Sequence, residues 1–342
     1  MKLNIAIGKD NNGWFTRFET YFCILQKDYP QLRYEIIDLD SDEFEKEILD
    51  FDAILWNPGY MGLRLSGHLK EKIYFAEKYL GKLIFPSYDT VWHFESKIAQ
   101  QLLFEHSKIR YPKTKISFNY LHAKKIINDI NYPVVLKKSE GASSKNVKLI
   151  KNKKWLSIYI ERVFCNQFWS EHRKYYSKPQ MLTRFFTKRW FWSFIISQYL
   201  KTDDGIGVLY LQEFIPDNNA DLRITIIGKK FAIAFWRNNR PGDFRASGSG
   251  LLDYRKKIPF DVLRYCQDIS VKNNFDSMAY DILFINEEFY INEISYSYVD
   301  KAIYNTPGYY YLGENIEFIE DHTWPQALWV KAFIDKIQTK YS

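Results

Sequence analysis

The chain has 342 residues, of which 46% are hydrophobic and 18% aromatic, so it has enough apolar side chains for a large core. Its composition excludes a disordered or collagen-like chain, and no run approaches the ~20 uncharged apolar residues that cross a bilayer. The length predicts two or three lobes. Three cysteines (Cys23, Cys165 and Cys266) lack metal-ligand spacing, which argues against a zinc site and favours a reducing compartment. Because the first apolar stretch is too short for a secretory signal, we expect a cytoplasmic protein.

The net charge of +7 comes from one segment of the chain. Residues 172–201 contain seven basic residues that no acidic residue interrupts between His172 and Thr202: Arg173, Lys174, Lys178, Arg184, Lys188, Arg189 and Lys201. A local excess of this kind predicts contact with one anionic partner rather than a surface that coats nucleic acid. We therefore expect no nucleic-acid partner.

The first 90 residues alternate short apolar runs with helical patterns. The predicted strands are Leu3–Ile7, Tyr34–Leu39, Ala53–Trp56 and Leu83–Phe85. Buried strands separated by helices predict a parallel sheet, and ligands of such sheets bind beyond the carboxyl ends of the strands. The loops Gly8–Gly13 and Asn57–Gly62 lie there, and their glycines serve either a ligand or the turns alone.

A helical pattern covers residues 92–107, and a hairpin pattern follows at Val134–Ile150. The hairpin places Lys137 on a strand before the small-residue loop Glu140–Asn146. Backbone N–H groups of such a loop can approach phosphates closely, with the lysine as a point charge. The alternative is a plain hairpin tip with a solvated lysine.

A second hairpin pattern near the C-terminus brings two carboxylates together. We expect the strands Met278–Ile285 and Phe289–Ser295 around a three-residue loop, so that Ile285 faces Phe289 and Asp281 faces Glu293. Ser295 shares their face by the period of two. Opposed like charges destabilise a sheet unless a cation lies between them, and oxygen ligands favour magnesium. Alternatively, the carboxylates point into water.

Between these hairpins lies a strand at Leu209–Ile215, then a hairpin with Gly228 in its turn and a basic loop with glycines and serines at 241–250. Arg237 ends a strand of that hairpin and Arg245 lies on the loop. Either guanidinium can reach a phosphate or carboxylate bidentately, or form a surface salt bridge.

Taken in order, these motifs resemble the ATP-grasp ligases, in particular the branch of the RimK-like glutamate ligases and glutathione synthetase. The resemblance covers residues 90–300 and is carried by four motifs: Gln212-Glu213-Phe214-Ile215, Asp221-Leu222-Arg223, Gly242-Asp243-Phe244-Arg245 and the Asp281…Glu293 pair. It implies an α/β (α+β) ATP-grasp fold whose two subdomains enclose a nucleotide. The corresponding domains are a Rossmann-like N-terminal domain at 1–90, a central subdomain at 91–210 with a basic aromatic insertion at 165–200, and a C-terminal subdomain at 211–342.

The resemblance also implies roles for individual residues. ATP contacts would come from Lys97, Lys137, Gly141, Ser143, Ser144, Gln212, Glu213, Phe214, Ile215, Asp221, Ala246 and Ser247. Arg237 and Arg245 would act in catalysis, and Asp281, Glu293 and Ser295 would bind one or two magnesium ions. The family usually has asparagine where Ser295 stands, which leaves the second ion open.

The implied reaction is ATP-dependent ligation of a carboxylate to an amine through an acyl phosphate, with an amino acid, a peptide or a uronic-acid glycan as acceptor. The alternative is a nucleotide-binding protein without ligase turnover. The basic segment at 172–201 would pack against the rest of the chain, contact an anionic substrate or the membrane surface, or supply the contact of a homo-oligomer.

Overall fold

The structure is a computed structural model of the chain and describes all residues except 1, 11, 58–62, 139–146, 165–206 and 342. The chain forms two compact units, Met1–Arg110 with Asp217–Ser342, and Tyr111–Pro216. The predicted division at residues 90 and 210 stays a prediction. None of the helices in the described part is long and apolar enough to cross a membrane.

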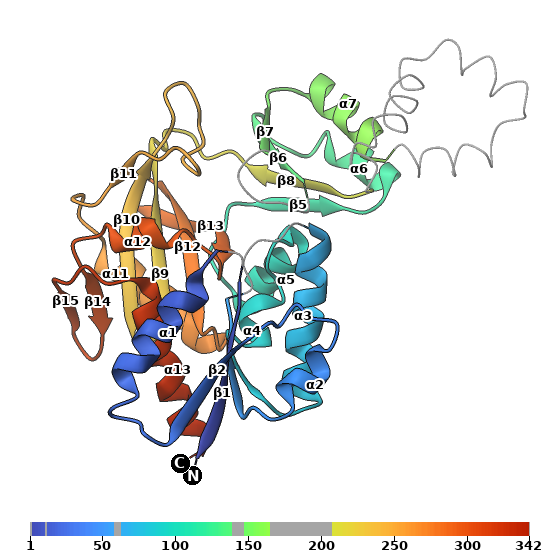
Figure 1. The fold of residues 1–342 in the computed structure, drawn as a ribbon. Coiled ribbons are helices and arrows are strands. Elements are labelled where there is room, and N and C mark those ends of the chain that lie inside the picture. The colour runs from blue at the N-terminus through green and yellow to red at the C-terminus, as the bar shows by residue number, and fades with distance from the viewer. Residues whose placement is uncertain (1, 11, 58–62, 139–146, 165–206, 342) are drawn as a thin grey trace, which may run out of the picture. The chain divides into compact units, whose positions relative to one another are not determined.

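The first unit begins with a four-stranded parallel sheet in the order β2-β1-β3-β4, which confirms the predicted parallel sheet. Its strands are β1 (Leu3–Gly8), β2 (Leu32–Ile37), β3 (Ala53–Leu55) and β4 (Leu83–Phe85). The helices between them are α1 (Trp14–Leu25), α2 (Phe44–Ile48) and α3 (Leu63–Lys78). The strands are buried throughout β3 and β4, as expected where helices cover both faces (Figure 1).

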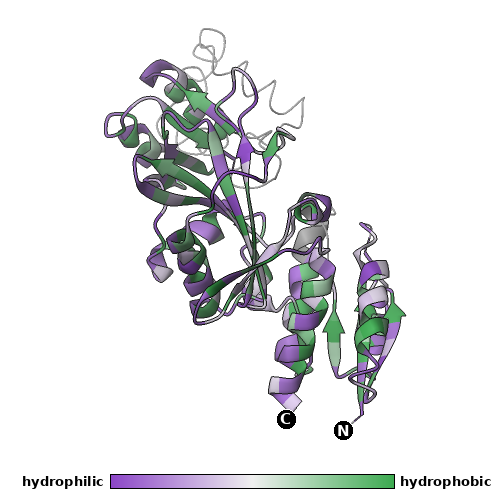
Figure 2. Ribbon diagram, turned by 90° about the vertical axis from the view of Figure 1, so that its left-hand side faces the viewer, coloured by the Kyte–Doolittle hydropathy of each residue, from purple (hydrophilic) through white to green (hydrophobic). Residues whose placement is uncertain are grey.

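The C-terminal helix α13 (Pro325–Tyr341) packs beside α1 on this sheet (Figure 1). Aromatic side chains fill the contact: Trp14 and Phe18 of α1 have ring centroids 5.2 and 5.8 Å from Trp329. The remaining helices of this part are α4 (Tyr88–Val91) and α5 (Lys97–Ser107). Helix α13 carries both hydrophobic and hydrophilic residues along its length (Figure 2), so it serves the core and also presents polar groups.

A seven-stranded sheet forms the rest of the first unit, in the order β13-β12-β9-β10-β14-β15 with β11 paired to β10. The strands are β9 (Ala220–Ile227), β10 (Phe231–Asn238), β11 (Leu252–Asp253), β12 (Ser277–Ile285), β13 (Glu288–Ser295), β14 (Tyr309–Leu312) and β15 (Ile316–Ile319). Helix α11 (Phe260–Lys272) packs on β9 and β12, and α12 (Asp300–Tyr304) precedes β14. The β9–β10 hairpin turns at Gly228, as predicted.

The second unit contains an antiparallel sheet in the order β5-β8-β6-β7. Its elements are β5 (Thr114–Ser117), α6 (Tyr120–Ile126), β6 (Val134–Lys137), β7 (Val147–Ile150), α7 (Lys153–Val163) and β8 (Leu209–Glu213). Strands β6 and β7 confirm the hairpin predicted for Val134–Ile150. One face of the sheet packs on both helices through alternate apolar residues, among them Val134, Leu136 and Leu211.

Two sequence predictions need correction. The first turn of the predicted 92–107 helix is not helical, because α5 begins at Lys97 after the N-cap Ser96, which accepts a hydrogen bond from the Ala99 N–H. The loop between β12 and β13 has two residues, not three, because Ile285 pairs with Glu288. A β-bulge at Asn292 adds one residue to β13 and restores the predicted pairing of Asp281 with Glu293.

Candidate functional site

One face of the seven-stranded sheet carries a row of charged side chains. The hydroxyl of Tyr280 is hydrogen-bonded to Ser270 of α11 at 2.7 Å, so Tyr280 faces that helix. Asp281 follows Tyr280 in the strand and therefore points to the opposite face. Its cross-strand partners are Arg223 on β9 and Glu293 on β13. We name this set the charged face: Lys97, Asp221, Arg223, Arg237, Asp281 and Glu293.

The buried Arg237, the half-buried Arg223 and two buried aspartates form the centre of the charged face. Arg237 donates from Nε and Nη2 to the two carboxylate oxygens of Asp221, both at 2.6 Å. Arg223 donates in the same bidentate way to Asp281 at 2.8 and 2.9 Å. Arg237 Nη2 also lies 2.7 Å from Asp281 Oδ2. The four charges cancel, which burial requires because an unpaired charge is costly there.

Lys97 and Glu293 extend the charged face at its edge. Lys97, the first residue of α5, is 8% exposed, and its Nζ donates to Glu293 Oε1 at 3.2 Å. Ser295, the third predicted metal ligand, donates its hydroxyl proton to the carbonyl of Ser297 at 2.7 Å. Its hydroxyl oxygen therefore keeps lone pairs that can accept a hydrogen bond or ligate a cation.

Burial and neighbouring charges shift the pKa values of these groups in opposite directions. Burial alone would raise the pKa of Asp281, but Arg223 and Arg237 outweigh it and hold that pKa below the usual range. Burial raises the pKa of Asp221 and the nearby Asp281 carboxylate adds to the rise, which outweighs the opposing effect of Arg237. Burial would lower the pKa of Arg237, but the two carboxylates raise it. The guanidinium of Arg237 therefore stays charged.

The donor atoms of the charged face fit a hard divalent cation. Asp281 and Glu293 offer carboxylate oxygens from directly paired residues, and magnesium is commonly held by one or two carboxylates together with substrate phosphates. No group of three His, Cys, Asp or Glu side chains suited to a metal ion occurs in the described parts of the chain. In the structure the cations beside these carboxylates are arginine and lysine side chains, so a metal ion would have to replace some of those contacts.

The predicted residues Arg245, Ala246 and Ser247 lie on the loop between β10 and β11. Arg245 is bonded to Asp243, two residues before it, with Nη2 2.6 Å from Oδ2. The side-chain hydrogen bond to Asp243 raises the pKa of Arg245. Ala246 is buried, and the Ser247 carbonyl accepts a hydrogen bond from Arg240 at 3.2 Å. Arg245 is therefore ion-paired within its own loop.

The second unit holds the other predicted nucleotide residues. Lys137 pairs with Tyr210 at the end of β6, and Gln212 lies two residues further along β8. Leu136 and Leu211, which directly precede these two residues in their strands, belong to the core on the helix side of the sheet. The side chains of Lys137 and Gln212 therefore lie on the face opposite to α6 and α7. Lys137 and Gln212 are 7% and 3% exposed.

The segment after β8 continues the motif Gln212–Ile215. Glu213 is exposed, and its N–H donates to the Lys113 carbonyl at 2.8 Å. Phe214 is half-buried and Ile215 is buried. The predicted loop residues Gly141, Ser143 and Ser144 and the segment 165–200 lie outside the described residues.

Sequence reasoning missed one residue of the charged face. Arg223 received no role, although it belongs to a motif that the resemblance uses. It follows Asp221 by two positions on β9, so the period of two places both on one face. The pairing of Arg223 with Asp281 could not be predicted, since it depends on the antiparallel pairing of β9 with β12, which are far apart in the chain.

Comparison with known proteins places this geometry in context. Residues 95–170 match a family model described as the RimK-like ATP-grasp domain. The chain is also 24% identical over 184 residues to the α-aminoadipate–LysW ligase LysX of Saccharolobus solfataricus, covering 54% of each protein. It thus spans about half the length of this curated relative.

Solved structures share the fold over nearly the whole chain. An ATP-grasp ligase associated with RiPPs from Chryseobacterium gregarium, in complex with ADP and a leader and core peptide, has a TM-score of 0.55 at 13% identity, covering 98% of this chain and 97% of that one. The ATP-grasp ligase PsnB, complexed with minimal precursor, Mg and ADP, has a TM-score of 0.56 at 9% identity, covering 98% of both chains.

Proposed function

We propose that this chain, which has the ATP-grasp fold and carries a RimK-like ATP-grasp domain, is an ATP-dependent carboxylate–amine ligase. The observation that carries the proposal is the charged face, where Asp281 and Glu293 lie side by side among buried cations. Such a face suits a triphosphate and a divalent cation, because carboxylates hold the cation and guanidinium or ammonium groups neutralise phosphate oxygens.

The proposed chemistry follows from the weakness of a carboxylate as an electrophile. A substrate carboxylate oxygen would attack the γ-phosphorus of ATP and the bond to ADP would break, which gives an acyl phosphate. An amine nitrogen would then attack the carbonyl carbon and lose a proton, while the carbon–oxygen bond breaks and phosphate leaves with one oxygen of the original carboxylate. Each step places negative charge where fixed cations stabilise it.

The residues would divide this work as follows. Asp281 and Glu293 would hold magnesium, which when bound neutralises phosphate charge. Lys97 and Lys137 would neutralise phosphate oxygens as well. Arg237 would stabilise the reacting acyl group, for which its guanidinium must leave Asp281, 2.7 Å away in the structure.

The substrates that we propose are an amino acid and a peptide or small protein. The names of LysX and of the Chryseobacterium ligase refer to an amino acid, LysW and a peptide. A uronic-acid glycan stays in the test panel because the sequence leaves it open. Glu213 and Phe214 would hold adenine, with Gln212 and Ile215 beside them, and Asp221 would bind ribose after release from Arg237.

Phosphate release tests the proposal. The purified chain with magnesium and ATP should release phosphate and ADP only with a matching carboxylate and amine, and oxygen-18 from the labelled carboxylate should appear in the phosphate. Lys137→Ala should lower turnover by about 10²- to 10³-fold. Lys148→Ala is the control, since Lys148 lies over the Tyr159 ring on the helix side of the same sheet, with Nζ 4.9 Å from the ring centroid.

The alternative of nucleotide binding without turnover has its own signature. Two features favour binding without turnover: a serine at position 295, and the pairing of both Asp281 oxygens with arginines. Both lower the number of oxygen atoms that can bind a second metal ion. Magnesium-dependent ATP binding in calorimetry, with no phosphate release for any substrate pair, would replace the ligase proposal with this one.

A further inference from the structure

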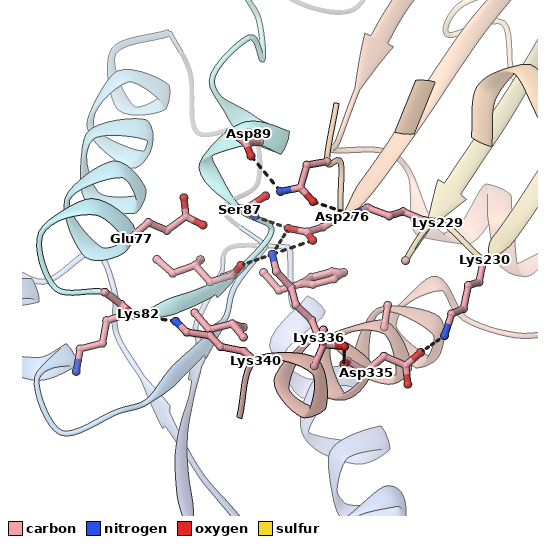
Figure 3. Close-up of a pocket in the computed structure, with 18 of the residues that line it drawn as sticks. Glu77, Lys82, Ser87, Asp89, Lys229, Lys230, Asp276, Asp335, Lys336 and Lys340 are labelled. Atoms are coloured by element: carbon pink, nitrogen blue, oxygen red, sulfur yellow. Dashed lines mark hydrogen bonds and ion pairs between the residues drawn. The ribbon is translucent and has the colours of Figure 1, made fainter. Parts of the chain in front are cut away.

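A cavity of about 690 Å³ lies in the first unit, at the turn of the β9–β10 hairpin (Figure 3). Its walls are the α3–β4 connection, strand β4, the hairpin turn, the segment before β12 and one stripe of α13. The volume falls within the range of about 300–1,000 Å³ that is typical of small-molecule sites. None of its lining residues belongs to the charged face.

The cavity is lined by an excess of cationic side chains. Six lysines (Lys78, Lys82, Lys229, Lys230, Lys336 and Lys340) outnumber four carboxylates (Glu77, Asp89, Asp276 and Asp335). Two lysines are neutralised: Lys336 donates to both oxygens of Asp276 at 2.9 Å, and Lys230 lies 2.9 Å from Asp335 (Figure 3). These pairs hold the walls together.

Three further lysines bond to neutral oxygens, and one of them, Lys82, donates to the Leu49 carbonyl at 2.6 Å. Lys340 donates to the Gly81 carbonyl at 2.8 Å, and Lys229 donates to the Asn274 amide oxygen at 2.7 Å. The remaining carboxylates also have local donors: Glu77 accepts from the Tyr88 N–H at 2.9 Å and Asp89 from Asn274 Nδ2 at 3.1 Å. Positive charge is therefore left over on two different walls of the cavity.

The spacing along α13 concentrates this charge. Ala332, Lys336 and Lys340 follow one another at intervals of four and form one stripe of the helix that lines the cavity. Burial lowers the pKa of Lys340, and the charge of Lys336 lowers it further, while the Glu77 carboxylate opposes this shift. Asp276 already compensates the charge of Lys336, whereas Lys340 donates to a carbonyl oxygen. An anion in the cavity would add a counter-charge beside Lys340.

We infer that this cavity, which we call the lysine cavity, binds a small anion with two or more acidic groups, held between Lys340 of α13 and Lys229 of the hairpin turn. One acidic group would meet each wall. The ion pair Lys336–Asp276 in the wall would stay intact, because the anion takes donors that now bond to neutral oxygens. The site does not depend on the proposed ligase activity.

Binding of two probes tests this inference. Pyrophosphate and citrate, titrated in metal-free buffer at constant ionic strength, represent phosphate and carboxylate sources, and acetate is the monovalent control. We expect saturable calorimetric binding and a higher melting temperature with at least one polyanion, and neither effect with acetate. The probe that binds more tightly identifies the acidic group.

Matched variants locate the site. Lys229→Gln/Lys340→Gln should weaken polyanion binding at least tenfold, whereas Lys331→Gln should leave it within twofold, because Lys331 is exposed on α13 and does not line the cavity. Lys137→Ala should also bind the polyanion normally, which excludes the proposed nucleotide residues. Equal binding by the double variant and the unchanged chain, or no binding of either polyanion, would overturn the inference.

Discussion

The two ends of the β9–β10 hairpin compensate charge in different ways. At the charged face, Arg237 and Asp221 are each 5% exposed and bonded to each other, and their strands bring carboxylate and guanidinium together. At the turn, about 23 Å away along the strand, Lys229 and Lys340 bond to neutral oxygens. Burial explains the difference, because a buried charge needs a fixed partner while water compensates a charge at an open cavity.

The difference has a consequence for ligand binding. A ligand at the charged face must exchange existing ion pairs, so its affinity depends on the energy of those pairs. A ligand at the lysine cavity adds to ammonium groups that carry no carboxylate partner in their hydrogen bonds. The comparison therefore predicts large effects of single charge changes at the first end and small ones at the second.

The largest effect is expected for Asp281→Asn. This substitution keeps the shape of the side chain but removes the charge that Arg223 and Arg237 share. Breaking a buried pair leaves uncompensated charge and should lower the free energy of unfolding by about 3–5 kcal/mol. Denaturant unfolding followed by circular dichroism measures it.

Asp268→Asn is the control for this change, because Asp268 is exposed on α11. It should alter the free energy of unfolding by no more than about 0.5 kcal/mol. If both variants lost the same small free energy of unfolding, the buried network would not be stabilised by charge compensation.

A smaller effect is expected in the pH dependence of stability, because it reports only one part of the stability that Asp281 contributes. The pKa of Asp281 is lower in the folded chain than the ordinary value of 3.8, so ionised Asp281 stabilises the fold above that value. As the pH falls below about 4, the unfolded chain takes up the proton first and this stability is lost. Unfolding between pH 5 and 3, at about half-unit steps, should show a shallower acid slope for Asp281→Asn. Identical slopes would contradict the assigned direction of the pKa shift.

The hairpin of β12 and β13 shows how far the sequence predicts the site. The pairing of Asp281 with Glu293 was predicted correctly from a wrong loop length. The two-residue loop shifts the register by one, and the bulge at Asn292 shifts it back. Alternation of residue types fixes which side chains can share a face, but bulges depend on the backbone of the folded sheet.

Other parts of the molecule were less accessible to sequence reasoning. Local patterns predicted the parallel sheet and the hairpins, because each depends on neighbouring residues. The role of Arg223 depends on the β9–β12 pairing, and the lysine cavity combines α13 with β4 and the β9–β10 turn. These arrangements join residues that no local spacing connects.

A smaller loss of stability is expected for a substitution at the turn of the β9–β10 hairpin. Gly228 has φ +58°, and a Cβ added there would lie 2.5 Å from the Ala332 Cβ of α13. Gly228→Ala should therefore lose about 1–2 kcal/mol from the left-handed backbone and a further ~1 kcal/mol from crowding. Gly81→Ala isolates the backbone part, since Gly81 has φ +65° and open space around it. Thermal unfolding should rank Gly228→Ala as the less stable variant, and the reverse order would contradict the close contact of the turn with α13.

The smallest effect is expected at the rim of the lysine cavity. The side chains of Lys230 and Asp335 are 52% and 47% exposed, so water and salt already screen their attraction across 2.9 Å. Lys230→Gln should lower the free energy of unfolding by about 0.2–1 kcal/mol in dilute buffer. In about 1 M salt, where the Debye length falls to about 3 Å, this difference should become smaller, whereas the loss caused by Asp281→Asn should persist because Asp281 and Arg237 are buried. Unfolding of both variants at the two salt concentrations measures the contrast. A salt-resistant effect of Lys230→Gln would mean that the exposed pair behaves like the buried network and that exposure does not separate the two ends of the hairpin.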